Sequence, residues 1–197
     1  MTAPATLTSM MLLTLRAPGE AAAVILSRPW PRDALWSAVV VISVVNTWLA
    51  TLSNYIFPVP EQLQTFLASP FLYFTLIAGG FVLMVHALFW TGRMLGGAET
   101  MGDLLTLMIW LQVMRTVAQA VMIVLILLSP VLASFVMLFV GVATLWIFMH
   151  FLNIGLKLNS MMRAFGVLIV GTMGLLLSLS ILFSIIGVAA IGVPPNV

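Results

Sequence analysis

The sequence predicts an all-α, polytopic integral membrane bundle with five transmembrane helices and a short amphipathic segment before the first of them. Three observations predict this fold class. Hydrophobic residues make up 63% of the 197 residues, charged residues make up only 6%, and the apolar residues lie in long runs. An average soluble domain is about 25% charged, and a water-soluble fold could not cover this much apolar surface. The composition therefore excludes soluble, disordered and nucleic-acid-binding proteins.

The chain divides into a predicted N-terminal segment, residues 1–33, and a predicted transmembrane domain, residues 34–197. Residues 5–28 are modestly amphipathic, and Pro18-Gly19-Glu20 places a proline and an acid where the first turn of a helix favours them. Two interpretations of this segment remain open. It either lies along the cytoplasmic membrane interface or forms a partly ordered tail that packs on the bundle.

Five apolar runs are long enough to cross a membrane, which takes about 20 helical residues. A tight turn is predicted at Ser129-Pro130, because proline has no amide proton and disfavours helix in the residue before it. The fifth run is longer than a span requires, so it tilts or begins in the interface. The five runs are residues 34–57, about 66–90, 104–128, 131 to about 153, and about 161–191.

Positive charges separate cleanly between the predicted loops. Six of the seven basic residues fall in segments that the alternating spans place on one side of the membrane, and none falls in a loop on the other side. The positive-inside rule therefore predicts a cytoplasmic N-terminus and a C-terminus outside. The six residues are Arg16, Arg28, Arg32, Arg93, Lys157 and Arg163.

The seventh basic residue, Arg115, lies about eleven residues or about 16 Å inside the third span. An arginine at the bilayer centre costs about 2.5–3.5 kcal/mol on translocon scales, so it should face protein or water. Gln112 and Gln119 share its helix face by their spacing, and Asn46 lies at a similar depth in the first span. These four residues form either a site for an anion, a lipid headgroup or a partner's acid, or a set of hydrogen bonds between helices.

The loop between the second and third spans contains Gly92, Arg93, Gly96 and Gly97, and Asp103 follows it. Glycine amides can hold a phosphate, but this loop lacks the Gly-Lys-Ser/Thr ending of a P-loop. We interpret it as a turn in which glycine supplies positive φ, with Arg93 anchored at lipid phosphates and Asp103 near the start of the third span.

Metal and cofactor binding are not expected. The chain has no cysteine, which excludes thiolate metal sites and disulfides. His86, His150, Glu99 and Asp103 fall near the predicted cytoplasmic ends of the spans, but their spacing matches no known metal motif. Ordinary hydrogen bonding is the favoured interpretation of both histidines.

The loop sequence Thr91-Gly92-Arg93-Met94-Leu95-Gly96-Gly97, followed by Asp103-Leu104-Leu105, resembles bacterial members of the Yip1 family. Leu15-Arg16-Ala17-Pro18 and Trp110 to Arg115 agree with it, as do residues 160–164. The resemblance implies five helices with a cytosolic N-terminus, in a bacterial inner-membrane protein. Eukaryotic members bind small GTPases, but they carry a longer cytosolic region and Tyr- and Gly-containing motifs that are not seen here, which argues against GTPase binding.

We therefore expect a non-enzymatic membrane protein that acts as a scaffold or binds partners. The short loops leave no room for a soluble catalytic domain, and the spans contain no paired acids or Ser–His pair. The expected partners are membrane lipids and a membrane protein or a second copy of the chain, not nucleic acid. The alternative is a small channel or transporter that binds an anion or lipid headgroup through Arg115.

Overall fold

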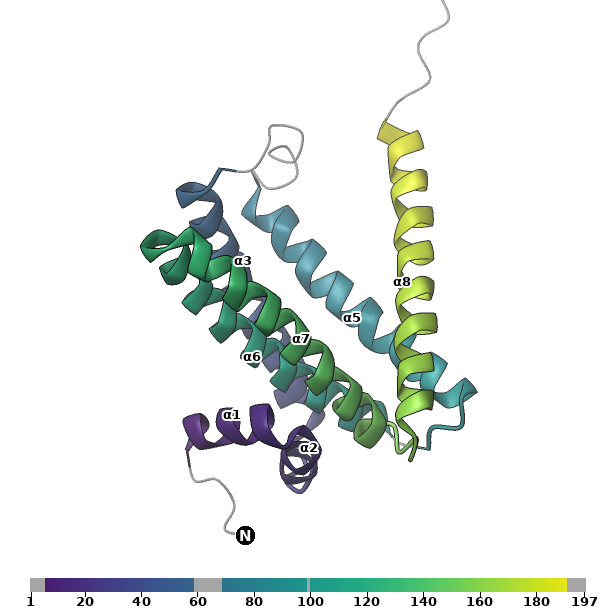
Figure 1. Cartoon of the computed structure of the whole chain (residues 1–197). Coiled ribbons are helices and arrows are strands. Elements are labelled where there is room, and N and C mark those ends of the chain that lie inside the picture. The colour runs from purple at the N-terminus through teal and green to yellow at the C-terminus, as the bar shows by residue number, and fades with distance from the viewer. Residues whose placement is uncertain (1–5, 59–68, 99, 191–197) are drawn as a thin grey trace, which may run out of the picture.

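The computed structural model describes residues 6–58, 69–98 and 100–190, and these residues form seven helices (Figure 1). The all-α prediction is confirmed. The helices are α1 (Leu7–Arg16), α2 (Pro18–Leu26), α3 (Arg32–Ile56), α5 (Pro70–Met94), α6 (Met101–Leu128), α7 (Pro130–Gly155) and α8 (Met161–Ala190).

Five helices are long and apolar enough to cross a membrane, which confirms the predicted number of spans. They are α3, α5, α6, α7 and the Met161–Ile181 part of α8. Capping residues set boundaries that hydropathy had not located. Helix α5 starts at Pro70 because Ser69 accepts a hydrogen bond from the amide of Leu72 (3.3 Å). Residues 66–68, where the second span was expected to begin, lie outside the described residues.

The predicted turn between the third and fourth spans is confirmed. Ser129 ends α6 and is also the N-cap of α7, where its hydroxyl accepts a hydrogen bond from the amide of Leu132 (3.3 Å). At the other end of α6, Thr100 is the N-cap, and it accepts from the amide of Asp103 (3.3 Å). The helix therefore begins three residues before the predicted start at residue 104, with Asp103 in its first turn.

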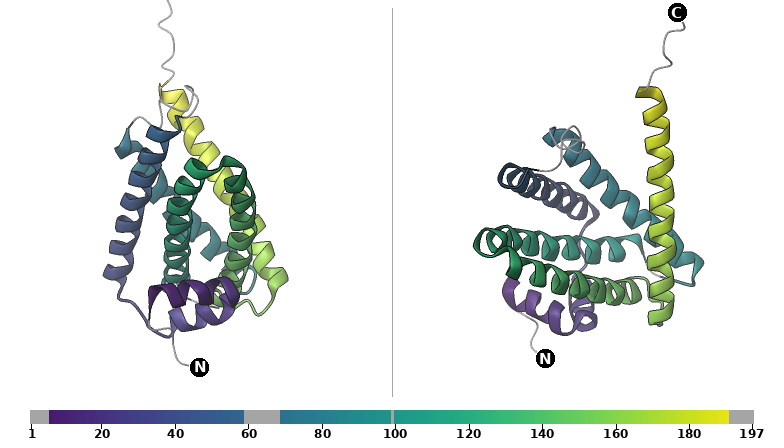
Figure 2. Two further views of the ribbon diagram at one scale, coloured as in Figure 1. Left: turned by 60° about the vertical axis from the view of Figure 1, so that its left-hand side comes forward. Right: turned by 45° about the horizontal axis from the view of Figure 1, so that its top comes forward.

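The span helices alternate in direction, so their connections gather at two ends (Figure 1). We call one of them the basal end: it contains the α5–α6 and α7–α8 connections and the α1–α2 hairpin, which lies across the base of the bundle (Figure 2, left). All six basic residues predicted for one side of the membrane lie at this end. The charge asymmetry of the sequence is thus an asymmetry of the molecule.

Two turns at the basal end touch through glycine. Gly97 donates a backbone hydrogen bond to the carbonyl of Gly92 (2.8 Å), and Ala98 donates to the carbonyl of Leu156 (3.2 Å). A Cβ on Gly92 would lie 2.7 Å from the Leu156 side chain, and one on Gly97 would lie 2.9 Å from the Gly92 carbonyl oxygen. We call Gly92, Gly97 and Leu156 the basal contact. Of the loop glycines, Gly96 has the expected positive φ (92°), whereas Gly92 and Gly97 allow close approach.

Helix α8 packs on α5 only near the basal end. A Cβ on Gly171 would lie 3.0 Å from the Leu88 side chain, whereas one on Gly174 would meet nothing within 4 Å. Beyond this point α8 diverges from α5, as Figure 1 and the right-hand view of Figure 2 show. Small residues in the fifth span therefore serve close packing in its first half.

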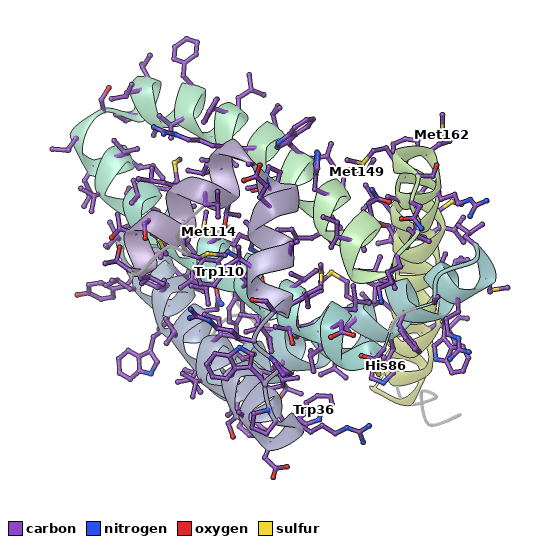
Figure 3. The ribbon with its side chains drawn as sticks, turned by 90° about the horizontal axis from the view of Figure 1, so that it is seen from below. Trp36, His86, Trp110, Met114, Met149 and Met162 are labelled. Carbon is purple, nitrogen blue, oxygen red and sulfur yellow. The ribbon has the colours of Figure 1, made fainter. Side chains whose placement is uncertain are left out.

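The N-terminal segment forms two ordered helices that pack on α6 and α7. Thr14 of α1 is fully buried and accepts a hydrogen bond from the indole N–H of Trp110 in α6 (2.9 Å). Ala21 and Ala22 of α2 are also fully buried. Figure 3 shows Trp110 and Met114 next to α1. The packing on the bundle is thus observed, as two helices and not as a partly ordered tail. The expected position along the cytoplasmic membrane interface stays a prediction.

We predict that Gly97→Ala destabilises the protein by about 1–3 kcal/mol, because the new methyl group would lie 2.9 and 3.0 Å from the backbone carbonyl oxygens of Gly92 and Leu156. Thermal unfolding in detergent measures this effect. Gly141→Ala is the matched control, since a Cβ there meets nothing within 4 Å. Equal melting temperatures for Gly97→Ala and Gly141→Ala would show that the basal contact is not tight.

We predict that Thr14→Val loosens α1 from the bundle, because the indole N–H of Trp110 loses its acceptor. Amide hydrogen exchange of residues 7–16 should become about five- to tenfold faster, while exchange in α6 stays unchanged. Thr8→Val, which changes an exposed threonine of the same helix, serves as the control. Unchanged exchange in Thr14→Val would contradict the docking of α1 through this bond.

Candidate functional site: the Arg115 groove

Arg115 lies in the middle of α6. It follows Met101 by fourteen positions in a helix of 28 residues, or about 21 Å along the axis. Its side chain is exposed. Within the part of the chain that the structure describes, Arg115 forms neither a hydrogen bond nor an ion pair. The arginine is therefore exposed and has no counter-charge among the described residues.

The Arg115 side chain lines a groove of about 330 Å³ between α6 and α7. Met11 and Leu15 of α1 form one end of this groove, and Val140 and Ala143 of α7 belong to its wall. Apart from Arg115, Thr144 is the one polar residue among those that line it. We call this feature the Arg115 groove. It offers a single cation in apolar surroundings.

Asn46 and Gln112 belong to a different set of contacts, which joins α6 to α3. The amide nitrogen of Asn46 donates to the hydroxyl of Thr116 (3.0 Å) and to the carbonyl of Ile42 (2.9 Å), and Thr116 donates to the carbonyl of Gln112 (2.8 Å). Asn46, Gln112 and Thr116 are all buried. No hydrogen bond joins Arg115 to Asn46 among the described residues, and Asn46 contacts α6 through Thr116.

Gln119 lies in a third place. It lines a cavity of about 190 Å³ with Thr51 and Asn54 of α3 and Tyr73 of α5. The structure thus does not bring the four predicted polar residues into one site. Arg115 is about 60° around α6 from Gln112. Helix α3 contacts α6 at Thr116, whereas α7 lies across the Arg115 groove. Gln112 thus belongs to the face of α6 that packs on α3, and Arg115 belongs to the face toward α7. The spacing of residues along α6 alone does not reveal where one face ends and the other begins.

The loop residues of the predicted motif have structural contacts. The guanidinium of Arg93 lies 5.8 Å from the centre of the Phe89 ring, and the Arg93 side chain is exposed. The carboxylate of Asp103 accepts a hydrogen bond from the Thr100 hydroxyl (2.6 Å), which completes the cap of α6. With Gly92 and Gly97 in the basal contact, the motif shapes a turn.

Each histidine contacts its own helix. The Nδ1 atom of His86 lies 2.8 Å from the carbonyl oxygen of Val82, and that of His150 lies 2.9 Å from the carbonyl oxygen of Trp146. Among the described residues, no three His, Asp or Glu side chains lie close enough together to hold a metal ion. Glu99 lies outside those residues.

Sequence reasoning missed two contacts that shape this region. The Thr14–Trp110 hydrogen bond joins residues 96 positions apart, so no pattern of residue spacing predicts it. Leu156 is almost fully buried at a turn, and only the two glycines packed on it hint at its role.

No curated protein and no solved structure matches the chain. The Yip1 domain matches residues 12–190, which include all five candidate spans, α2 and the second half of α1. Members of this family are generally non-catalytic membrane proteins. The protein is a multi-pass membrane protein by its spans, and over this match it belongs to the Yip1 domain family.

Proposed function

We propose that this protein is a non-catalytic membrane scaffold that binds a membrane-embedded protein partner through the Arg115 groove. The observation that carries the proposal is the exposed guanidinium of Arg115, half-way along a candidate span and without a counter-charge in the described residues. A charge in that position is costly in lipid. A partner that supplies a carboxylate or backbone carbonyl groups removes the cost and gains binding energy.

The surroundings of Arg115 favour a counter-charge that is supplied by another molecule. The acids in the first turns of the span helices are Asp33 and Asp103, both at the basal end and far along the helices from Arg115. The apolar wall from α7 offers packing for a partner helix laid along the groove. A charge pair formed there is stronger than one in water because the local dielectric constant is low.

An anionic lipid headgroup or small anion at Arg115 is the second candidate. It is favoured by one observation: Met11 and Leu15 of the N-terminal hairpin form one end of the groove, so the groove opens beside a helix expected near the membrane surface. A channel or transporter has less support, because a groove whose polar lining is Arg115 and Thr144 offers no continuous polar path.

We also propose that the protein lies in the bacterial inner membrane with its basal end in the cytoplasm. The six basic residues at that end support this orientation through the positive-inside rule. The loop motif that resembles bacterial Yip1 proteins supports the location.

We predict that Arg115→Leu lowers the recovery of a stoichiometric membrane-protein partner by tenfold or more, because the partner's counter-charge is left unpaired. The measurement is crosslinked affinity capture of the tagged protein from native membranes, read by quantitative mass spectrometry. Gln119→Leu is the matched control, since it removes a polar group one turn away in a different cavity.

The same variants separate the alternatives. Arg115→Leu should not lower the melting temperature, whereas a role in holding the helices together requires that it does. Unchanged recovery of every protein partner in Arg115→Leu would contradict the scaffold proposal. Loss of a co-purified anionic lipid, with no protein lost, would establish the lipid candidate instead.

A further inference from the structure

A second cavity lies at the basal end, separate from the Arg115 groove. Its volume is about 480 Å³, and it lies between the first turns of α3 and α6 with the α2–α3 connection as a third wall. Pockets that hold small molecules have volumes of about 300–1,000 Å³. The basal cavity is therefore large enough for a lipid headgroup.

Two arginines give the basal cavity a net positive charge. Arg28 and Arg32 both line it and are exposed, and in the part of the chain that the structure describes neither forms an ion pair. Asp103 also lines the cavity, and its carboxylate accepts a hydrogen bond from the Thr100 hydroxyl (2.6 Å). Two positive charges therefore stand against one negative charge. Such a site favours an anion with no positive charge of its own.

The inner side of the basal cavity is apolar and faces the membrane domain. Leu35 of α3 and Leu105 of α6 line it and are buried. Trp30 and Trp36 also line it and remain 59% and 43% exposed, and Figure 3 shows Trp36 at this end of α3. Tryptophan is enriched at membrane–water boundaries. Since Arg32 is the first residue of a candidate span, charge lies at the mouth and apolar surface lies deeper.

We propose that the basal cavity binds the phosphodiester headgroup of an anionic phospholipid. Arg28 and Arg32 hold the phosphate, because the planar guanidinium donates paired hydrogen bonds to phosphate oxygens. The first carbons of the lipid tails lie against Leu35 and Leu105. This site is independent of the partner proposed for Arg115, and a phospholipid fits it better than a soluble anion does because the cavity joins charge to apolar surface.

The test is native mass spectrometry of the full-length protein in detergent, titrated with dioleoylphosphatidylglycerol or dioleoylphosphatidylcholine. The wild type should retain phosphatidylglycerol more strongly than phosphatidylcholine. The double variant R28Q/R32Q should lose phosphatidylglycerol affinity by about tenfold or more. The control R16Q/R163Q removes the same number of charges from the basal end, away from the cavity, and should bind as the wild type does.

Gly102→Leu tests the cavity without changing charge. A Cβ on Gly102 would meet only the Thr100 hydroxyl, at 3.7 Å, and Gly102 lines the cavity, so we expect a leucine there to occupy part of the cavity. This variant should lose phosphatidylglycerol as R28Q/R32Q does. Leucine is a better helix former than glycine, so we expect this variant to fold. If R28Q/R32Q fails to fold, Gly102→Leu alone therefore tests whether the cavity binds the lipid.

Four results would overturn the proposal. One is equal retention of the two lipids, and another is an equal loss in R16Q/R163Q. The third is full phosphatidylglycerol binding by Gly102→Leu. The fourth is displacement of phosphatidylglycerol by millimolar inorganic phosphate, which would assign the cavity to a soluble anion. Arg115→Leu should bind phosphatidylglycerol as the wild type does. A failure of the phospholipid proposal can therefore be distinguished from a failure of the partner proposal.

Discussion

The close approach of two turns at the basal contact is the constraint on which the arrangement of the helices depends. Leu156 packs against Gly92 and Gly97, and a side chain larger than that of glycine at either position would occupy the space that Leu156 fills. Gly155 extends the same principle to α6, because a Cβ on it would lie 2.8 Å from the Leu107 side chain. Helices α5, α6 and α7 therefore meet at one end, and α8 begins beside them. Helices joined tightly at one end are free to separate at the other, as α5 and α8 do in Figure 1.

This convergence explains why the N-terminal segment is central to both proposed binding sites. The hairpin of α1 and α2 packs across the ends of α6 and α7 through the buried Thr14 and the Ala-rich face of α2. Its first helix then forms one end of the Arg115 groove, and the connection after its second helix forms a wall of the basal cavity. One segment outside the spans thus borders both the groove proposed for a partner and the cavity proposed for a phospholipid.

Features with a local cause could be predicted from the sequence. The spans follow from apolar runs, the turn at Ser129 follows from the proline after it, and the basic end follows from the order of charges and spans. Features that depend on which faces meet could not. Arg115, Gln112 and Gln119 lie within one helix face by spacing, yet α3 and α7 take adjacent parts of that face and separate them. Asn46 bonds to Thr116, the residue next to Arg115, and this choice of partner depends on the rotation of α3 against α6.

We propose that a protein, and not lipid alone, occupies the Arg115 groove. The most direct test of this proposal is a diazirine-bearing amino acid placed at Val140, which lines the groove, and at Val142, which is 64% exposed outside it. After illumination of native membranes, we expect a discrete protein adduct at position 140 that Arg115→Leu abolishes, and lipid adducts at position 142. Lipid adducts alone at both positions would contradict a protein partner in the Arg115 groove.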